Sequence, residues 1–227
     1  MGIRDNLRRV LDRIEQARRR SPFAQSVRVV AVTKGVDLSR IQQAVAEGVQ
    51  EFGENRVQEA ASKVSDFPSL RWHLIGHLQT NKAKQALGLF ELIQSVDRLP
   101  LAEAIQREAQ RSDRTASILV QVNTQEDPSK FGILPQELLS ILEKVAALDR
   151  LRVLGLMTIA PFVSDPEQCR PFFRKLRLLK ESAEKETFPN CEFSILSMGM
   201  SQDFEAAIEE GSTMVRIGTA IFGERHE

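Results

Sequence analysis

The chain has 227 residues, of which 42% are hydrophobic and 27% charged, a composition typical of a globular protein that buries a sizeable core. Its 31 basic and 31 acidic residues leave no formal net charge, so we expect no nucleic-acid partner. No apolar run approaches the roughly 20 residues of a membrane span, and no hydrophobic leader follows Met1. We therefore expect no membrane partner and a cytoplasmic location. Cys169 and Cys191 are isolated, which predicts reduced thiols.

The first predicted element is a helix. Apolar residues from Ile3 to Ile14 recur at helical spacing, which predicts an amphipathic helix over residues 3–20 that ends before Ser21. Its arginines alternate with acidic residues, as on a solvated helix face. The helix precedes the first strand, so we expect it to pack outside the remaining fold.

A regular alternation of short apolar strands and amphipathic helices follows. We predict strands at 27–35, 49–53, 71–76, 90–95, 116–122, 151–156, 192–196 and 213–217. The intervening helices are expected at 38–47, 55–64, 80–88, 98–110, 135–147, 166–185 and 202–210. Eight strands that alternate with helices are the number that closes a parallel barrel. The sequence therefore predicts one α/β domain over 1–227, a (β/α)8 TIM-type barrel. An open doubly wound sheet is the alternative, but no glycine-rich dinucleotide fingerprint follows the first strand.

Lys34 is the most informative residue of the first strand. The segment 27–35 is apolar apart from Arg28 until it reaches Thr33 and Lys34. An ammonium group among apolar neighbours is disfavoured in its charged form, and the free amine is what Schiff-base chemistry with a carbonyl requires. The alternative is that Lys34 ends the strand and extends its charged head into water.

Other candidate residues follow the later strands. In a parallel barrel the carboxyl ends of all strands open on one face, where active sites lie. The candidates there are Lys34, Glu54, Asn55, His77, Gln79, Asn123, Met157, Thr158, Ser197–Ser201, Arg216, Gly218 and Thr219.

The last two loops have the composition of a phosphate site. Glycines and hydroxyls around Ser201, Gly218 and Thr219 open short helices, and the loops after strands seven and eight commonly hold phosphate in barrels. The alternative is ordinary helix N-capping by Ser201 and Thr219. Asp203 counts against an anion unless its side chain points away.

A strand-end lysine and two anion-suited loops together describe a ligand with an aldehyde and a phosphate, and pyridoxal phosphate (PLP) fits that description. Arg216 lies on the last strand and is expected to face the ring nitrogen. A guanidinium keeps its proton, so the ring would be a weak electron sink. A barrel enzyme that binds a sugar phosphate through Lys34 without a cofactor is an alternative.

The histidines point less clearly to a role. His73 and His77 lie four residues apart, but no third ligand accompanies them, so no metal site is predicted. Glu54 and His77 are either proton-transfer groups or hydrogen-bonded residues at the rim.

Six segments of the chain resemble the pyridoxal phosphate homeostasis protein family. They are VVAVTKG (29–35), FGENRVQE (52–59), WHLIGHLQTNK (72–82), GLMTIAP (155–161), LSMGMSQDF (196–204) and VRIGTAIFG (215–223). The resemblance implies an alanine-racemase-type barrel, known as fold type III, without the C-terminal β domain of the racemases. It also implies PLP bound covalently to Lys34, with cofactor contacts from Asn55, Ser201, Arg216, Gly218 and Thr219.

The resemblance implies a function in PLP homeostasis, by buffering the cofactor or delivering it to apo-enzymes, with effects on amino-acid and keto-acid balance. It implies no established reaction. The alternative is a PLP-dependent amino-acid racemase. Racemases of this type use a tyrosine as opposing base, and this chain has none, which leaves His77 as the candidate second base. We therefore expect a non-catalytic binding protein. No long exposed apolar stripe demands a dimer, so we expect a monomer.

Overall fold

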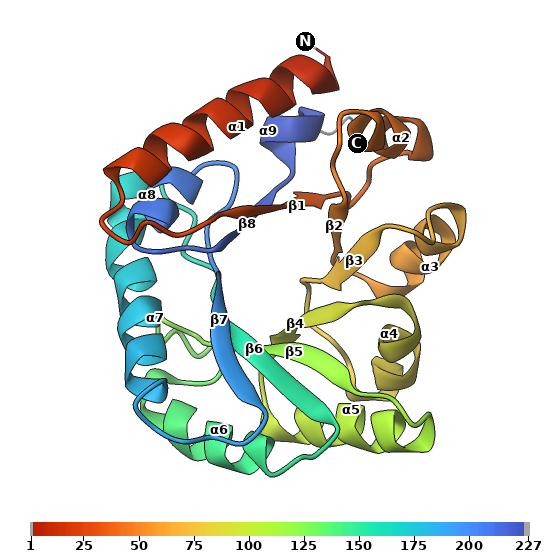
Figure 1. Cartoon of the computed structure of the whole chain (residues 1–227), viewed down its shortest axis with the longest axis vertical. Helices are drawn as coiled ribbons and strands as arrows, with labels where there is room; N and C mark the ends of the chain where they lie inside the picture. The colour runs from red at the N-terminus through yellow and green to blue at the C-terminus, as the bar shows by residue number, and fades with distance from the viewer. Residues whose placement is uncertain (1, 225–227) are drawn as a thin grey trace.

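The eight predicted strands close into a parallel barrel with the order β1 to β8, so the predicted (β/α)8 fold is confirmed (Figure 1). The structure, a computed structural model, describes residues 2–224. The strands are β1 (Arg28–Val32), β2 (Glu51–Glu54), β3 (Arg71–Leu74), β4 (Leu92–Val96), β5 (Ala116–Gln121), β6 (Leu151–Met157), β7 (Cys191–Ser197) and β8 (Met214–Ile217).

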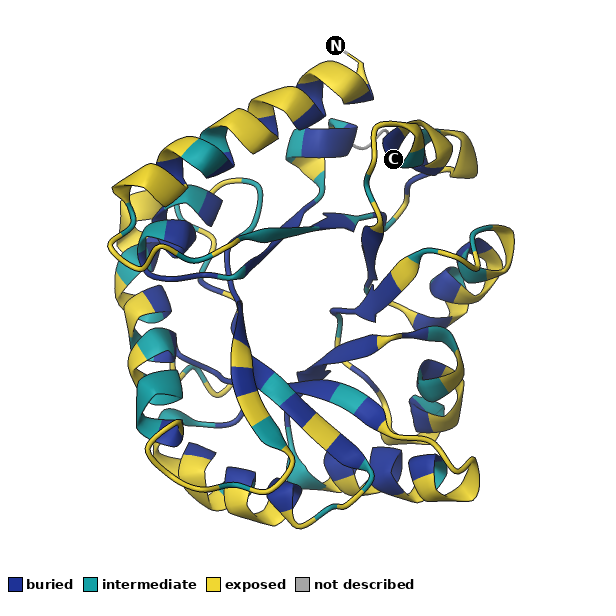
Figure 2. Cartoon of the chain, in the orientation of Figure 1, coloured by how far each residue is buried: buried dark blue, intermediate teal, exposed yellow. Residues whose placement is uncertain are grey.

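Helices cover the outside of this barrel (Figure 1). They are α1 (Ile3–Arg20), α2 (Leu38–Ala46), α3 (Val57–Asp66), α4 (Ala83–Leu89), α5 (Leu99–Arg111), α6 (Leu138–Ala146), α7 (Arg170–Ala183), α8 (Phe204–Glu209) and α9 (Thr219–Phe222). Figure 2 shows that their buried faces are turned to the barrel and their exposed faces to solvent. This is the amphipathic pattern from which the helices were predicted.

Three helices begin differently from their prediction. Short 3-10 turns at Thr80–Lys82, Pro135–Glu137 and Pro166–Cys169 precede α4, α6 and α7. Proline lies at the start of the second and third of these turns, where its missing N–H costs no helical hydrogen bond. The predicted bounds ran these turns and the α-helices together, because 3-10 turns are frequent at the N-termini of α-helices and continue directly into them.

The N-terminal helix α1 lies across α8 and α9 (Figure 1). It buries Ile3, Leu7, Val10 and Ile14. A side-chain hydrogen bond reinforces this packing, because the Asn6 amide donates to the carbonyl of Ile221 at 2.9 Å. The start of the described chain is therefore joined to α9, the short helix that follows the last strand.

The inside of the barrel combines an apolar layer with polar side chains. The apolar layer consists of Val30, Leu92, Leu119, Met157, Ile195 and Met214. His73, Gln94 and Ser197 are also buried and form hydrogen bonds with one another or with Arg216. Gly155 allows close approach of β6 and β7, since a Cβ there would lie 1.8 Å from the Ile195 carbonyl oxygen.

Both cysteines are free thiols, as predicted. Among residues 2–224, no helix is long and apolar enough to cross a membrane.

Candidate functional site

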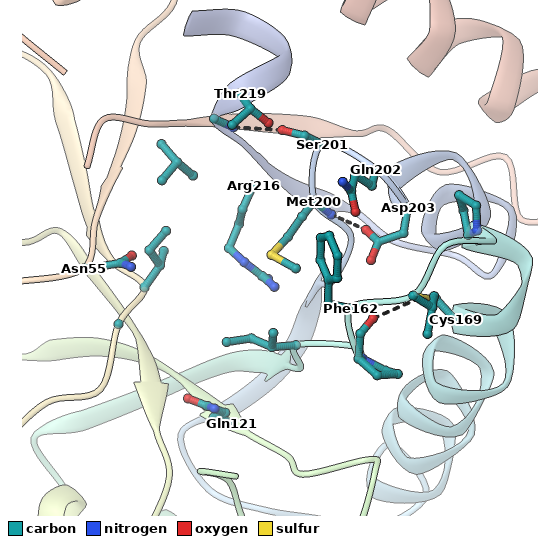
Figure 3. Close-up of a pocket in the computed structure, with 18 of the residues that line it drawn as sticks. Asn55, Gln121, Phe162, Cys169, Met200, Ser201, Gln202, Asp203, Arg216 and Thr219 are labelled. Atoms are coloured by element: carbon teal, nitrogen blue, oxygen red, sulfur yellow. Dashed lines mark hydrogen bonds between the residues drawn. The ribbon is translucent and has the colours of Figure 1, made fainter. Parts of the chain in front are cut away.

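A cavity of about 410 Å³ opens at the carboxyl ends of the strands (Figure 3). The loops that follow β2, β3, β6, β7 and β8 contribute to its wall. Five of the residues predicted to contact a cofactor line it together, although they come from distant parts of the sequence. They are Asn55, Ser201, Arg216, Gly218 and Thr219.

Lys34 lies beside this cavity, two residues beyond the end of β1. Its half-buried side chain lines an adjoining cavity of about 180 Å³, which shares Val32, Gly218 and Thr219 with the larger one. Side chains alternate along a strand. Val30 packs inside the barrel and Val32 lines the cavity, whereas Lys34 lies in the turn after β1 and lines the adjoining cavity.

Arg216 supplies a buried positive charge in the cavity wall (Figure 3). Its Nη1 donates to the Ser197 hydroxyl at 2.6 Å and its Nη2 to the Thr158 carbonyl at 2.7 Å. Burial lowers the pKa of Arg216 to about 10, although the charge of Asp203 acts in the opposite direction. The guanidinium therefore stays protonated at neutral pH and holds a fixed orientation.

A line of hydrogen bonds continues from Arg216 into the barrel. The Ser197 hydroxyl donates to Gln94 Oε1 at 2.6 Å, and Gln94 Nε2 lies 2.9 Å from His73 Nδ1. Because Arg216 can only donate, each later group must accept from the one before, which makes His73 Nδ1 an acceptor. Burial, followed by the charges of two neighbouring arginines, lowers the pKa of His73 to about 3. His73 is thus a neutral support of the barrel interior.

Ser201 connects the two loops that were predicted to hold phosphate. Its Oγ accepts hydrogen bonds from the backbone N–H groups of Gly218 at 3.3 Å and Ala220 at 3.2 Å. Ser201 therefore caps α9 and does not cap the helix that follows it, which begins at Phe204. The expected alternative of capping within its own loop is wrong, because the loop folds toward the end of β8.

Backbone amides at this point of the cavity remain free. The N–H groups of Ser201, Gln202 and Thr219 donate to no acceptor within residues 2–224. Gly199 has φ +95, and a Cβ there would lie 2.6 Å from the Ala207 Cβ, so the turn requires glycine. Free amides in a glycine-containing turn suit an anion.

Asp203 lines the same cavity, so its side chain does not point away (Figure 3). Its Oδ1 accepts a hydrogen bond from the Met200 N–H at 2.5 Å. Burial raises the pKa of Asp203, while the hydrogen bond from Met200 and the charge of Arg216 oppose that rise. Asp203 therefore counts against an anion bound close to its own carboxylate, as the sequence predicted for a side chain that does not point away.

The two predicted proton-transfer candidates occupy different environments. His77 lines the cavity, where its Nδ1 lies 2.7 Å from the Asp97 carboxylate and its ring stacks on Phe131 with centroids 3.8 Å apart. Glu54 is fully buried outside the cavity lining, bonded to Thr33 and Lys63. Glu54 and Asn55 are consecutive residues, so alternation at the end of β2 turns their side chains in opposite directions.

Other strand-end candidates support the site and do not line the cavity. Thr158 and Ser197 hold Arg216. The Asn123 amide donates to the Asp127 carbonyl at 2.7 Å and shapes the loop after β5. Met157 belongs to the apolar layer of the barrel. Gln79 precedes the 3-10 turn before α4.

An apolar rim surrounds the cavity mouth. Phe162 is 85% exposed, and Phe131 and Ile159 are also exposed large hydrophobic residues. Pocket walls of this kind bury the body of a ligand while a few polar groups orient it. This rim could not be predicted from the sequence, because isolated aromatic residues in loops follow no periodic pattern.

Fold and site together define a parallel α/β barrel whose cavity at the carboxyl ends of the strands suits a small anionic ligand, with a lysine beside two anion-suited loops. The chain belongs to the pyridoxal phosphate homeostasis protein family, and residues 6–226 match the family model described as alanine racemase, N-terminal domain.

Relatives of that name cover nearly the whole chain. The protein from Aquifex aeolicus is 42% identical over 228 residues, which is 99% of each chain. The human protein is 39% identical over 241 residues, covering 99% of this chain and 87% of that relative.

Solved structures of other proteins have the same fold as this chain. PipY of Synechococcus elongatus with PLP bound has a TM-score of 0.81 at 36% identity, covering 93% of this chain and 99% of that one. An alanine racemase of Clostridium difficile has a TM-score of 0.77 at 16% identity, covering 98% of this chain and 58% of the racemase. The second likeness concerns the fold alone.

Proposed function

We propose that this protein binds pyridoxal 5'-phosphate covalently through a Schiff base on Lys34 and acts in PLP homeostasis by buffering or delivering the cofactor. The observation that carries this proposal is the meeting of a buried cation, Arg216, with free backbone amides of the last two loops next to the Lys34 turn. The PLP-bound PipY structure, at 36% identity, supports it.

The residues present suit this cofactor. The cavity of about 410 Å³ is within the size range of small-molecule sites. The amides near Ser201 and Thr219 would hold the phosphate, Arg216 would face the ring nitrogen, and Asn55 would contact the ring from the opposite wall. When bound, PLP supplies an aldehyde that condenses with amines and a ring that accepts electrons.

Arg216 favours a binding role over demanding catalysis. Its guanidinium is protonated at neutral pH and is held by Ser197 and Thr158. It cannot transfer a proton to the ring nitrogen, so the ring stays a weak electron sink. We therefore propose a non-catalytic carrier, which acts as a cytoplasmic monomer, passes PLP to apo-enzymes and affects amino-acid and keto-acid balance.

Visible absorption tests the covalent bond. Protein loaded with PLP should be yellow, and Lys34→Ala should lose the band of the lysine-bound cofactor. Lys144→Ala, which removes an exposed lysine from α6, is the control and should stay yellow. Reduction with borohydride should add the mass of PLP to the peptide that contains Lys34; the mass of a sugar phosphate there would favour the cofactor-free alternative. Colour that survives Lys34→Ala unchanged would refute the lysine assignment.

A second candidate function, proton exchange on amino acids, is favoured by the His77–Asp97 pair. The 2.7 Å contact at Nδ1 leaves His77 Nε2 to accept or donate a proton in the cavity wall. Loaded protein incubated with single L-amino acids in deuterated water should then exchange the α-proton, and His77→Asn should not. The absence of exchange across the common amino acids would count against an enzyme.

A further inference from the structure

Three charged side chains enclose the turn that carries Lys34. They are Glu54 at the end of β2 and Glu59 and Lys63 on α3. Lys63 Nζ donates to Glu54 Oε1 at 2.7 Å, to Glu59 Oε1 at 2.9 Å and to the Thr33 carbonyl at 2.7 Å. Lys63 thus joins both carboxylates to the main chain immediately before Lys34.

The two carboxylates complete the enclosure of the turn. Glu54 Oε1 accepts a hydrogen bond from the Thr33 hydroxyl at 2.5 Å, and Glu59 Oε1 accepts one from the Gly35 N–H at 2.7 Å. The residues on both sides of Lys34 are therefore held by the same cluster. Within residues 2–224 the Lys34 side chain itself has no hydrogen bond, so its neighbours, and not its own head group, fix its place.

The burial of the cluster is unusual for charged residues. The side chains of Glu54 and Lys63 are 0% and 8% exposed, whereas Glu59 is 28% exposed. A buried ion pair adds little net stability compared with packed apolar residues, but removal of one partner leaves the other as a buried charge without compensation. Such a pair fixes geometry strongly, and here the geometry it fixes is that of the Thr33–Gly35 turn.

The cluster also carries an unbalanced charge. When ionised it has two carboxylates and one ammonium group, and Glu54 Oε2 is buried without a hydrogen-bond partner in the described part of the chain. The open acceptor lies on β2, the strand that pairs with β1 just before Lys34, and the second carboxylate lies on α3. The cluster therefore encloses the Thr33–Gly35 turn from two elements.

We propose that Glu54, Glu59 and Lys63 form a positioning clamp that holds the Thr33–Gly35 turn so that the Lys34 amine is delivered to the cavity. These residues act through the turn and touch neither cofactor nor substrate. The proposal rests on the proposed role of Lys34 and adds the residues that hold that lysine in place.

Glu59→Ala is the first test, because the partly exposed side chain lies on a helix that tolerates alanine. In the full chain freed of cofactor, hydrogen exchange of the Gly35 amide should accelerate roughly tenfold. The rate at which added PLP forms its visible band should fall roughly tenfold, which equals ~1.4 kcal/mol. Lys63→Met should lower the rate of band formation by a similar factor. Lys63→Arg should keep most of the rate of the unaltered chain.

Lys180→Met is the matched control, since it breaks a Lys180–Glu184 pair of similar length far from the turn. It should leave both rates unchanged. Faster Gly35 exchange with an unaltered rate of PLP condensation would overturn the clamp, as would Gly35 exchange that stays the same. Failure of the proposed function looks different, because the unaltered chain would then form no adduct on Lys34.

Discussion

Loss of the Lys63 ammonium group should destabilise the protein far more than loss of a surface lysine. Lys63→Met removes three hydrogen bonds and leaves Glu54 as a fully buried carboxylate without a cation. Glu59 can rehydrate, because 28% of its side chain is exposed, so one stranded charge determines the effect. Breaking a buried pair in this way costs about 3–5 kcal/mol. For a chain of this length the midpoint of thermal unfolding should fall by about 6–20 °C.

The pH dependence of the stability of Lys63→Met distinguishes a buried carboxylate without a cation from a general loss of packing. Burial raises the pKa of Glu54, and hydrogen bonds from Lys63 and Thr33 oppose that rise. In Lys63→Met the main opposing group is gone. A raised folded-state pKa of an acid gives stability that is present at low pH and lost as pH rises through that value. The deficit of Lys63→Met should therefore be smaller at pH 5 than at pH 8.

Urea unfolding of Lys63→Met, Glu54→Gln and the double variant measures the coupling directly. The two changes should be non-additive by roughly 2 kcal/mol, since Glu54→Gln removes the charge that Lys63→Met strands. The control Lys180→Met should cost no more than ~0.5 kcal/mol. A loss below ~1 kcal/mol in Lys63→Met, or additive effects in the double variant, would refute the reasoning.

Three further predictions concern the cavity and the barrel interior. Arg216→Gln should keep the covalent bond to Lys34 but shift the visible band and weaken PLP binding, as measured by spectral titration; an unchanged spectrum would exclude contact between Arg216 and the ring. Ser201→Ala removes the hydroxyl that joins the two loops and can donate its proton to a phosphate oxygen, so it should weaken the binding of inorganic phosphate roughly tenfold in calorimetry, with a stability loss of ~1 kcal/mol. The lowered pKa of His73 gives stability that is present above about pH 6.5 and lost as pH falls toward 3, so His73→Gln should flatten that slope, by up to ~1.4 kcal/mol per pH unit; equal slopes would contradict a neutral His73.

The barrel could be predicted from the sequence because strand and helix periods are local. The helix at 3–20 and the alternation that follows it are set by which face of each element is apolar. Most of the candidate cavity residues could also be predicted, since parallel strands bring their carboxyl ends to one face. The boundaries near Pro135 and Pro166 could not be predicted, because each 3-10 turn continues directly into the α-helix that follows it.

The supporting residues could not be predicted, because their partners are distant or lie on the other face of a strand. Lys63 follows Glu59 by four residues on α3, which from the sequence alone indicates an ordinary solvated pair. Only the packing of α3 against β2 reveals that Glu54 completes the cluster. Asp97 and Gln94 likewise acquire their roles through His77 and His73, some twenty residues away.

The pairing of β1 with β8, which closes the barrel, affects how the chain folds during synthesis. Strand β1 pairs with β8, with Val30 opposite Arg216, so the segment translated early waits for one translated near the end of the described chain. A contact of such long sequence separation forms late in folding. A nascent chain on the ribosome that has exposed Lys34 therefore still lacks Arg216 and the loop after β8, and the cavity is complete only after β8 has emerged and docked.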